Sequence, residues 1–275
     1  MRRLLLCLPV YFVLLPGGPR AESADKQAAP APLKAVKDDG AALPDNAAMT
    51  RLAKDDPIRF LENCLKRYDR EVQGYRCTLV KQERLEGKLQ RSEVTAIAFR
   101  ERPFSVLMEW KQGARLAQRV LYVKGANDDK LVVKPSGLAS LVGVVERDPE
   151  GPDARKSGRY PLTEFGIKIG MERTLAAWDA ARKDDALHVE YLGERKIPEV
   201  GGRPCWVLKR TGYKRPEEDG ITELITYIDK GTWLQVGSVV KGAEGQVLGA
   251  YYFRDIQLNP KFPADTFTRQ AVKGK

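Results

Sequence analysis

The chain has 275 residues, with 43% hydrophobic and 31% charged side chains and a formal net charge of +10. Its single histidine excludes zinc sites built from several histidines. An excess of basic residues is a usual feature of nucleic-acid binding, but acidic and basic side chains are interspersed here, as in residues 67–71, which favours a solvated mixed surface. A milder functional interpretation is attraction to anionic lipid or to an anionic envelope polymer.

The first residues predict a cleavable signal peptide over residues 1–23. Arg2 and Arg3 precede an apolar run over residues 4–15, and proline and glycine follow it. This run is shorter than the ~20 apolar residues that span a bilayer, and no later segment is long and apolar enough. The alternative is a buried N-terminal helix. We therefore expect export to the periplasm or another extracytoplasmic envelope space, with no transmembrane segment in the mature form and no nucleic-acid partner.

Residues 24–54 are rich in Ala, Pro, Lys and Asp and show no periodic apolar face. Such a segment cannot bury enough apolar surface to offset the entropy lost on ordering, so it is predicted to be a disordered tether. The remainder, residues 55–275, matches the ~220 residues of one β-rich domain.

The domain is predicted to begin with an amphipathic helix over residues 57–71. Asp56 supplies a capping side chain, Pro57 suits the first helical position, and apolar residues then recur at helical spacing. Alternating apolar residues and turn signals predict an antiparallel meander of about five strands next. These strands lie near residues 75–80, 94–99, 104–110, 120–123 and 131–134.

A stretch rich in Gly, Asp, Pro and Arg over residues 135–161 interrupts the meander. A second amphipathic helix is predicted over residues 162–183, and strands resume near 187–192, 205–211, 224–228, 234–240 and 247–258. The predicted fold is α+β but mainly β: a large, strongly curved antiparallel sheet with two main helices on one face.

The sequence predicts no catalytic residue, no metal site and no cofactor. His188 lies in a strand-like run, and there is no Gly-x-Ser-x-Gly elbow and no phosphate-binding glycine loop to accompany it. A pair of carboxylates brought together from distant strands stays open as an alternative, because sequence alone does not exclude it.

The cysteines left after removal of the signal peptide are Cys64, Cys77 and Cys205. Cys64 shares the apolar face of the first helix, and Cys77 shares the parity of the apolar residues in the first strand. A helix followed closely by a strand folds back against it, so we predict a Cys64–Cys77 disulfide with Cys205 reduced and buried. The alternative is three free, buried thiols.

Three separated blocks, residues 75–89, 102–110 and 159–167, resemble a bacterial family of exported domains without assigned function. The resemblance covers residues 55–260, and the family's strand order is similar to the lipoprotein-carrier fold of LolA and LolB. It implies a half-barrel in which helices cover the concave face of the sheet and enclose an apolar cavity for acyl chains.

The leading functional hypothesis is therefore a non-enzymatic envelope protein that holds a lipid or an acylated ligand in this cavity. The alternative is an envelope protein-interaction or scaffold module with a filled core and a protein partner, and a third hypothesis is a hydrolase of envelope polymer. Apolar residues at alternate strand positions are the candidate ligand-binding residues, although each also suits an ordinary core. They are Leu79, Val106, Met108, Trp110 and Tyr122.

Overall fold

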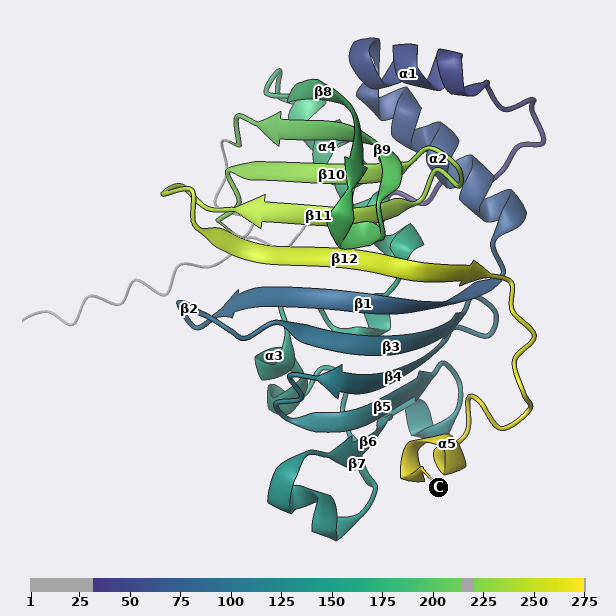
Figure 1. The fold of residues 1–275 in the computed structure, drawn as a ribbon, viewed down its shortest axis with the longest axis vertical. Coiled ribbons are helices and arrows are strands. Elements are labelled where there is room, and N and C mark those ends of the chain that lie inside the picture. Colours follow the sequence, from purple (N-terminus) through teal and green to yellow (C-terminus); the bar gives the residue numbers. More distant parts are fainter. Residues whose placement is uncertain (1–31, 214–219, 275) are drawn as a thin grey trace, which may run out of the picture.

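The computed structural model describes residues 32–213 and 220–274. The predicted signal peptide and residues 24–31 of the predicted tether lie outside the described residues. One antiparallel sheet of 12 strands dominates the described part, in the order β7-β6-β5-β4-β3-β1-β12-β11-β10-β9-β8, with β2 paired to β1 (Figure 1). The strands are β1 (Gly74–Leu85), β2 (Lys88–Leu89), β3 (Glu93–Arg100), β4 (Ser105–Gln112), β5 (Ala117–Val123), β6 (Leu131–Pro135), β7 (Val145–Arg147), β8 (His188–Ile197), β9 (Arg203–Thr211), β10 (Glu223–Asp229), β11 (Gln235–Lys241) and β12 (Val247–Leu258).

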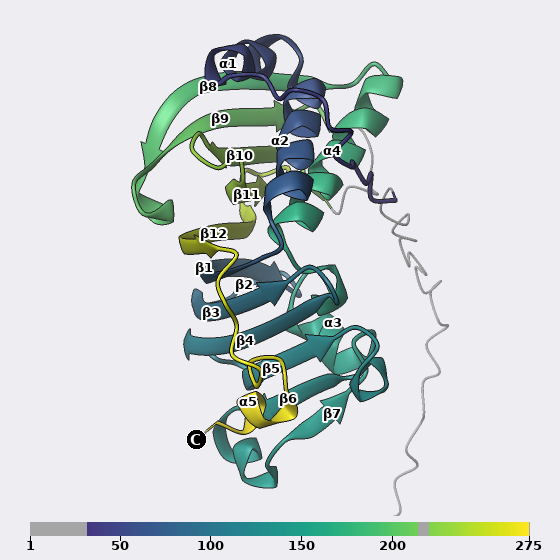
Figure 2. The ribbon, with the colours of Figure 1, turned by 90° about the vertical axis from the view of Figure 1, so that its right-hand side faces the viewer.

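The sheet consists of two meanders that meet at its centre. β1 and β12 are its two longest strands and pair with each other from Tyr75↔Leu258 to Glu83↔Gly249. The sheet curves strongly and stays open, with β7 and β8 at its two edges (Figures 1 and 2). This confirms the predicted α+β, mainly β fold with a half-barrel sheet.

The two longest helices form the inner layer of the fold, and the other helical segments are shorter. α2 (Pro57–Glu71) and α4 (Ile167–Lys183) lie on the concave side of the sheet (Figure 2). The others are α1 (Asn46–Asp55), α3 (Pro152–Ser157), α5 (Arg269–Lys273) and the 3-10 turns η1 (Asn127–Asp129), η2 (Gly137–Val142), η3 (Leu162–Glu164) and η4 (Pro198–Val200).

The local sequence accounts for the bounds of α2. The Asp56 side chain accepts a hydrogen bond from the Arg59 backbone N–H at 3.1 Å, and Pro57 occupies the first turn. Apolar side chains at helical spacing are buried beneath the helix: Ile58, Leu61, Leu65 and Tyr68. α4 begins at Ile167 rather than at residue 162, because Gly166 ends the preceding turn with a φ of 138°.

The segment before α2 corrects the sequence analysis, because residues 46–54 are not a disordered tether. Asp45 caps α1 by accepting from the Ala48 N–H at 2.7 Å, and Met49 and Ala53 are fully buried, with 0% and 1% exposure. The Trp206 Nε1–H donates to Thr50 Oγ1 at 2.8 Å. The short apolar face of this helix is too small for its pattern to stand out in the sequence, but a β9 tryptophan covers it.

Residues 32–44 lie alongside α2 and are joined to it by ion pairs, and we call this segment the strap. The Arg70 guanidinium donates to both Asp38 carboxylate oxygens, at 2.7 and 2.9 Å, and this contact lowers the pKa of Asp38 to about 2. Lys66 and Asp39 form a second ion pair of 2.6 Å. Most of these groups remain in contact with solvent, so each pair contributes little stability.

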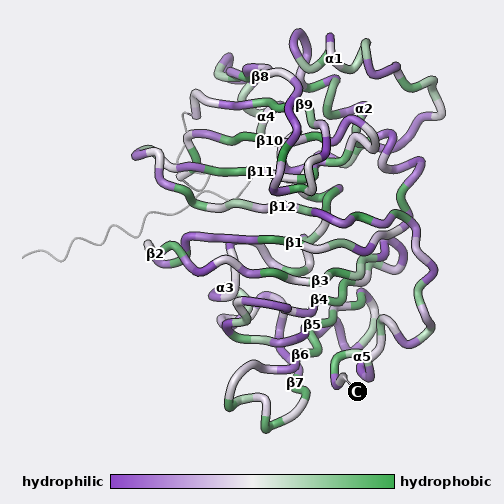
Figure 3. Tube along the Cα trace, in the orientation of Figure 1, coloured by the Kyte–Doolittle hydropathy of each residue, from purple (hydrophilic) through white to green (hydrophobic). Residues whose placement is uncertain are grey.

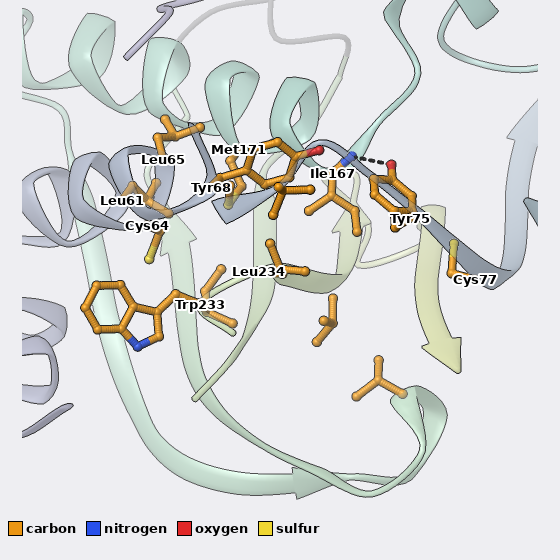
Figure 4. Close-up of a cluster of buried hydrophobic side chains, with 14 of the residues drawn as sticks. Leu61, Cys64, Leu65, Tyr68, Tyr75, Cys77, Ile167, Met171, Trp233 and Leu234 are labelled. Atoms are coloured by element: carbon orange, nitrogen blue, oxygen red, sulfur yellow. Dashed lines mark hydrogen bonds between the residues drawn. The ribbon is translucent and has the colours of Figure 1, made fainter. Parts of the chain in front are cut away.

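The predicted Cys64–Cys77 disulfide is wrong, since all three described cysteines are free and buried. Cys64 lies on α2 near Leu61, whereas Cys77 lies on β1 beyond Tyr75, and the two sulfurs are far apart (Figure 4). The chain between α2 and β1 is extended, so β1 runs away from the helix at Cys77 instead of folding back onto Cys64.

We expect three alkylatable thiols when the mature protein is unfolded without reductant. Burial raises the pKa of the Cys64 and Cys77 thiols and raises that of Cys205 to about 12, so all three stay protonated and react slowly in the folded state. Thiol counting by intact mass, with and without denaturant, measures both states. A disulfide-linked peptide in an unreduced digest would contradict the structure.

Candidate functional site

A cavity of about 880 Å³ lies between the concave face of the sheet and α4. β1, β3, β4, β5 and β6 supply one wall, and β9 to β12 supply residues beside α4. The segment over residues 157–167, between α3 and α4, covers part of it. The cavity therefore spans the junction of the two meanders.

Three of the five predicted ligand-binding residues line this cavity: Leu79, Met108 and Trp110. Val106 and Tyr122 do not, although Val106 shares its strand face with Met108. At that end of β4 the rings of Phe99 and Phe104 lie 5.4 Å apart, and Phe104 contacts Tyr122 at 5.8 Å. These aromatic rings fill the concave face there, so Val106 and Tyr122 belong to the closed core.

The side of α4 that borders the cavity is rich in small residues, although Ile167, Arg173 and Thr174 of the same helix also line it. Gly170, Ala177, Ala180 and Ala181 all line it. A Cβ atom added at Gly170 would meet no heavy atom within 4 Å. Larger α4 side chains, such as Met171 and Trp178, point instead into the filled core. A helix with small residues on one side leaves open space above the sheet. Sequence patterns do not reveal this space, because small residues on a helix carry no distinctive signal.

The cover over the cavity is held by aromatic and backbone contacts. The Arg173 guanidinium lies 4.1 Å from the Tyr160 ring, and Tyr160 packs against Tyr251 of β12 at 6.3 Å. The Ile167 backbone N–H donates to the Tyr75 hydroxyl at 3.1 Å, which joins the start of α4 to β1 (Figure 4). Gly166 is favoured between them, because its φ of 138° is strained for other residues and an added Cβ would lie 3.3 Å from the Phe99 ring.

A buried charged cluster lies in the cavity wall and centres on Glu83 and Glu93, each 4% exposed. Lys81 Nζ lies 3.0 Å from Glu83 and 3.7 Å from Glu93, because Lys81 and Glu93 are direct cross-strand partners. Trp110 Nε1–H donates to Glu93 at 2.7 Å, and the Tyr251 hydroxyl donates to Glu83 at 2.7 Å. Each oxygen of the Glu83 and Glu93 carboxylates therefore has a hydrogen-bond or ion-pair partner.

The same cluster fixes the cover. Arg115 donates from Nε to Glu93 at 3.1 Å and from Nη2 to the Ser157 carbonyl at 2.9 Å. Glu93 therefore connects β3 to the end of α3 through one arginine. Sequence reasoning missed this cluster, since its members come from β1, β3, β4, the β4–β5 connection and β12 and meet only through strand register.

We expect the Glu93→Ala substitution to lower the free energy of unfolding by about 3 kcal/mol, because it leaves buried cationic and indole donors without their acceptor. It should also speed amide exchange over residues 154–160, because Glu93 no longer holds Arg115 in place to bind the Ser157 carbonyl. The matched control is Glu109→Ala, which removes a more exposed β4 carboxylate paired with Lys111 and Arg119 and should cost less than about 1 kcal/mol. Equal losses for the two variants, measured by urea unfolding, would contradict this assignment.

The described residues hold no group of three or more His, Cys, Asp or Glu side chains that could bind a metal ion. His188 is exposed on the edge strand β8. Within the same part of the chain, no helix has the length and apolar character needed to cross a bilayer.

Comparison with known proteins places residues 72–273 in a family described as a protein of unknown function (DUF1571). This match confirms the resemblance to a family without assigned function that the three sequence blocks predicted. No curated protein matches the chain in sequence.

Solved structures with a similar fold include the Pseudomonas aeruginosa MucA/MucB complex, at 16% identity and a TM-score of 0.46 over 79% of this chain and 62% of that one. A LolA superfamily protein from Nitrosomonas europaea gives 10% identity and a TM-score of 0.30 over 71% and 90%. The Mycobacterium tuberculosis lipoprotein LppX gives 10% and 0.41 over 81% and 100%. The chain spans less than two thirds of the MucB chain in that complex. At these identities the likeness concerns the fold alone.

Proposed function

The chain belongs to the DUF1571 family of proteins of unknown function, and we propose that it is a non-enzymatic cell-envelope protein that binds a lipid or another acylated ligand. The ligand site is the cavity between α4 and the concave face of the sheet. Location in the envelope follows from the predicted signal peptide over residues 1–23 and is part of the same proposal.

The observation that carries this proposal is the cavity itself. Its volume of about 880 Å³ falls in the range of roughly 300–1,000 Å³ that is usual for small-molecule sites. A scaffold core, in contrast, is packed at crystal-like density with few voids larger than a water molecule. Apolar side chains from both meanders face the space, including Leu79, Val120 and Phe253, while the charged cluster lies in the wall near the cover. A ligand with an apolar body and a polar end would suit this arrangement.

A second candidate function is binding of a protein partner, and the edge strand β8 favours it. β8 has ten residues, of which five are exposed, and it ends the sheet. Such an edge presents unpaired backbone groups to which an extended peptide can add. Hydrolysis of an envelope polymer has less support, because the cavity carboxylates of Glu83 and Glu93 are both held by basic partners.

Titration of the delipidated protein with a fluorescent long-chain fatty acid tests the ligand proposal. Of the four tryptophans, only Trp110 lines the cavity, so it should transfer energy to a bound probe most efficiently. We expect saturable one-to-one uptake with a dissociation constant of about 1 μM or lower. Trp110→Phe should keep uptake, measured by the probe's own emission, and should lower the transfer more than loss of any other single tryptophan. Absence of saturable uptake would reject the ligand proposal and leave the protein-partner candidate.

A further inference from the structure

An exposed apolar tip projects from one end of the half-barrel. Three of its side chains belong to η2, in the connection between β6 and β7: Leu138 is 88% exposed, Leu141 85% and Val142 69%. The fourth, Leu116 of the β4–β5 connection, is 53% exposed. We call these four residues the apolar tip. Single exposed apolar residues are ordinary, but a cluster of this kind marks a contact surface.

Hydrogen bonds join the two connections that form the tip. The Ser136 N–H donates to the Leu116 carbonyl at 3.1 Å, and the Ser136 hydroxyl donates to the Arg115 carbonyl at 2.7 Å. η2 therefore starts directly beside Leu116. The tube view shows apolar residues in this loop beyond β7, at the end of the molecule remote from α1 (Figure 3).

The apolar tip is continuous with the cavity. Leu116 lines the cavity together with its neighbours Arg115 and Ala117, while its side chain also reaches solvent. A ligand that left the cavity beside Leu116 would therefore emerge next to the start of η2.

The charges around the tip point to the surface it contacts. Residues 136–144 contain no charged side chain, and the chain as a whole carries a formal net charge of +10. Lys134, just before η2, donates to the Lys273 backbone carbonyl at 3.0 Å, a neutral partner that leaves its charge in place. An uncharged apolar projection on a protein of net positive charge is a pattern of proteins that insert into the interface of an anionic bilayer.

We propose that the apolar tip inserts into the headgroup region of a bilayer that contains anionic phospholipid and holds the Leu116 end of the cavity against the membrane. The contact lets an acyl chain pass between the bilayer and the cavity without crossing water. The role in ligand transfer rests on the proposed function, whereas the membrane contact can be measured without it.

Sedimentation with vesicles tests the contact, using phosphatidylcholine alone and phosphatidylcholine with one third phosphatidylglycerol. We expect the mature protein to bind the anionic vesicles, less so at high salt. The triple substitution Leu138→Ser, Leu141→Ser and Val142→Ser should weaken binding about tenfold or more. The control is Leu33→Ser with Leu89→Ser, which changes exposed leucines away from the tip and should bind like the wild type. Lys134→Glu should weaken binding to the anionic vesicles.

The outcomes separate this proposal from the proposed function. The triple variant should still take up soluble fatty acid, since its changed side chains are exposed and only Leu116 of the tip lines the cavity. Vesicle binding without fatty-acid uptake would keep the membrane contact and reject the ligand. Wild-type binding by the triple variant would overturn the membrane contact. Failure of the wild type to sediment, together with tip-dependent dimerisation, would overturn it in favour of a second copy of the chain.

Discussion

Deletion of residues 32–55 is expected to lower the free energy of unfolding by about 3–5 kcal/mol, which corresponds to a fall of ~10 °C in the melting temperature for a chain of this size. The loss comes from α1. Met49 and Ala53 are buried beneath it, and Trp206 and Trp233 hydrogen-bond to Thr50 and Asn46 at 2.8 and 3.0 Å. Without the helix, two indole groups lose both their cover and their acceptors.

The control for this deletion removes residues 32–44 alone and keeps α1. That strap contributes partly exposed ion pairs, such as Asp38 with Arg70, and two half-buried apolar side chains, Val36 and Leu43, so its loss should cost clearly less than the loss of α1. Thermal and urea unfolding of the two deletions measure the difference. Little destabilisation by the longer deletion would restore the tether that the sequence predicted for this segment.

The Ala177→Phe substitution is expected to weaken fatty-acid uptake about tenfold or more while it changes stability by less than about 1 kcal/mol. Ala177 lies on the cavity side of α4, so a phenyl ring enters open space and occupies volume that the ligand needs. The ring overpacks little, and phenylalanine costs only about half a kcal/mol of helix propensity relative to alanine.

Ala47→Phe is the matched control, since it makes the same change at an exposed alanine on a helix away from the cavity. It should leave uptake unchanged. Probe titration and unfolding curves are needed for both variants, because an unfolded Ala177→Phe protein would lose uptake whether or not the ring occupies the ligand site. Full uptake by a folded Ala177→Phe variant would place the ligand elsewhere on the protein.

Local signals in the sequence predicted α2 and most strands, because their causes lie within a few residues. Asp56, Pro57 and the apolar spacing that follows determine α2 without reference to the rest of the fold. The pairing of β1 with β12 could not be predicted in the same way, since it joins residues more than 160 positions apart, as in Glu83↔Gly249. α1 was missed because its short apolar face is stabilised by distant tryptophans.

The candidate site was predictable only in part. Alternation along β1 and β4 identified Leu79, Met108 and Trp110, but the same alternation also selected Val106, which aromatic packing closes off. Whether a strand face borders a cavity depends on what lies opposite. That opposite wall includes Gly170 and three alanines of α4, which matter for the volume that they leave empty, and periodicity does not reveal such volume.

Native mass spectrometry of the protein, purified gently from the envelope of a bacterium that exports it, tests the central claim most directly. We predict a protein mass accompanied by one bound lipid or acylated molecule, removed by delipidation and absent from folded Ala177→Phe. A homogeneous ligand-free mass that takes up no fatty acid and no extracted envelope lipid would contradict the binding function.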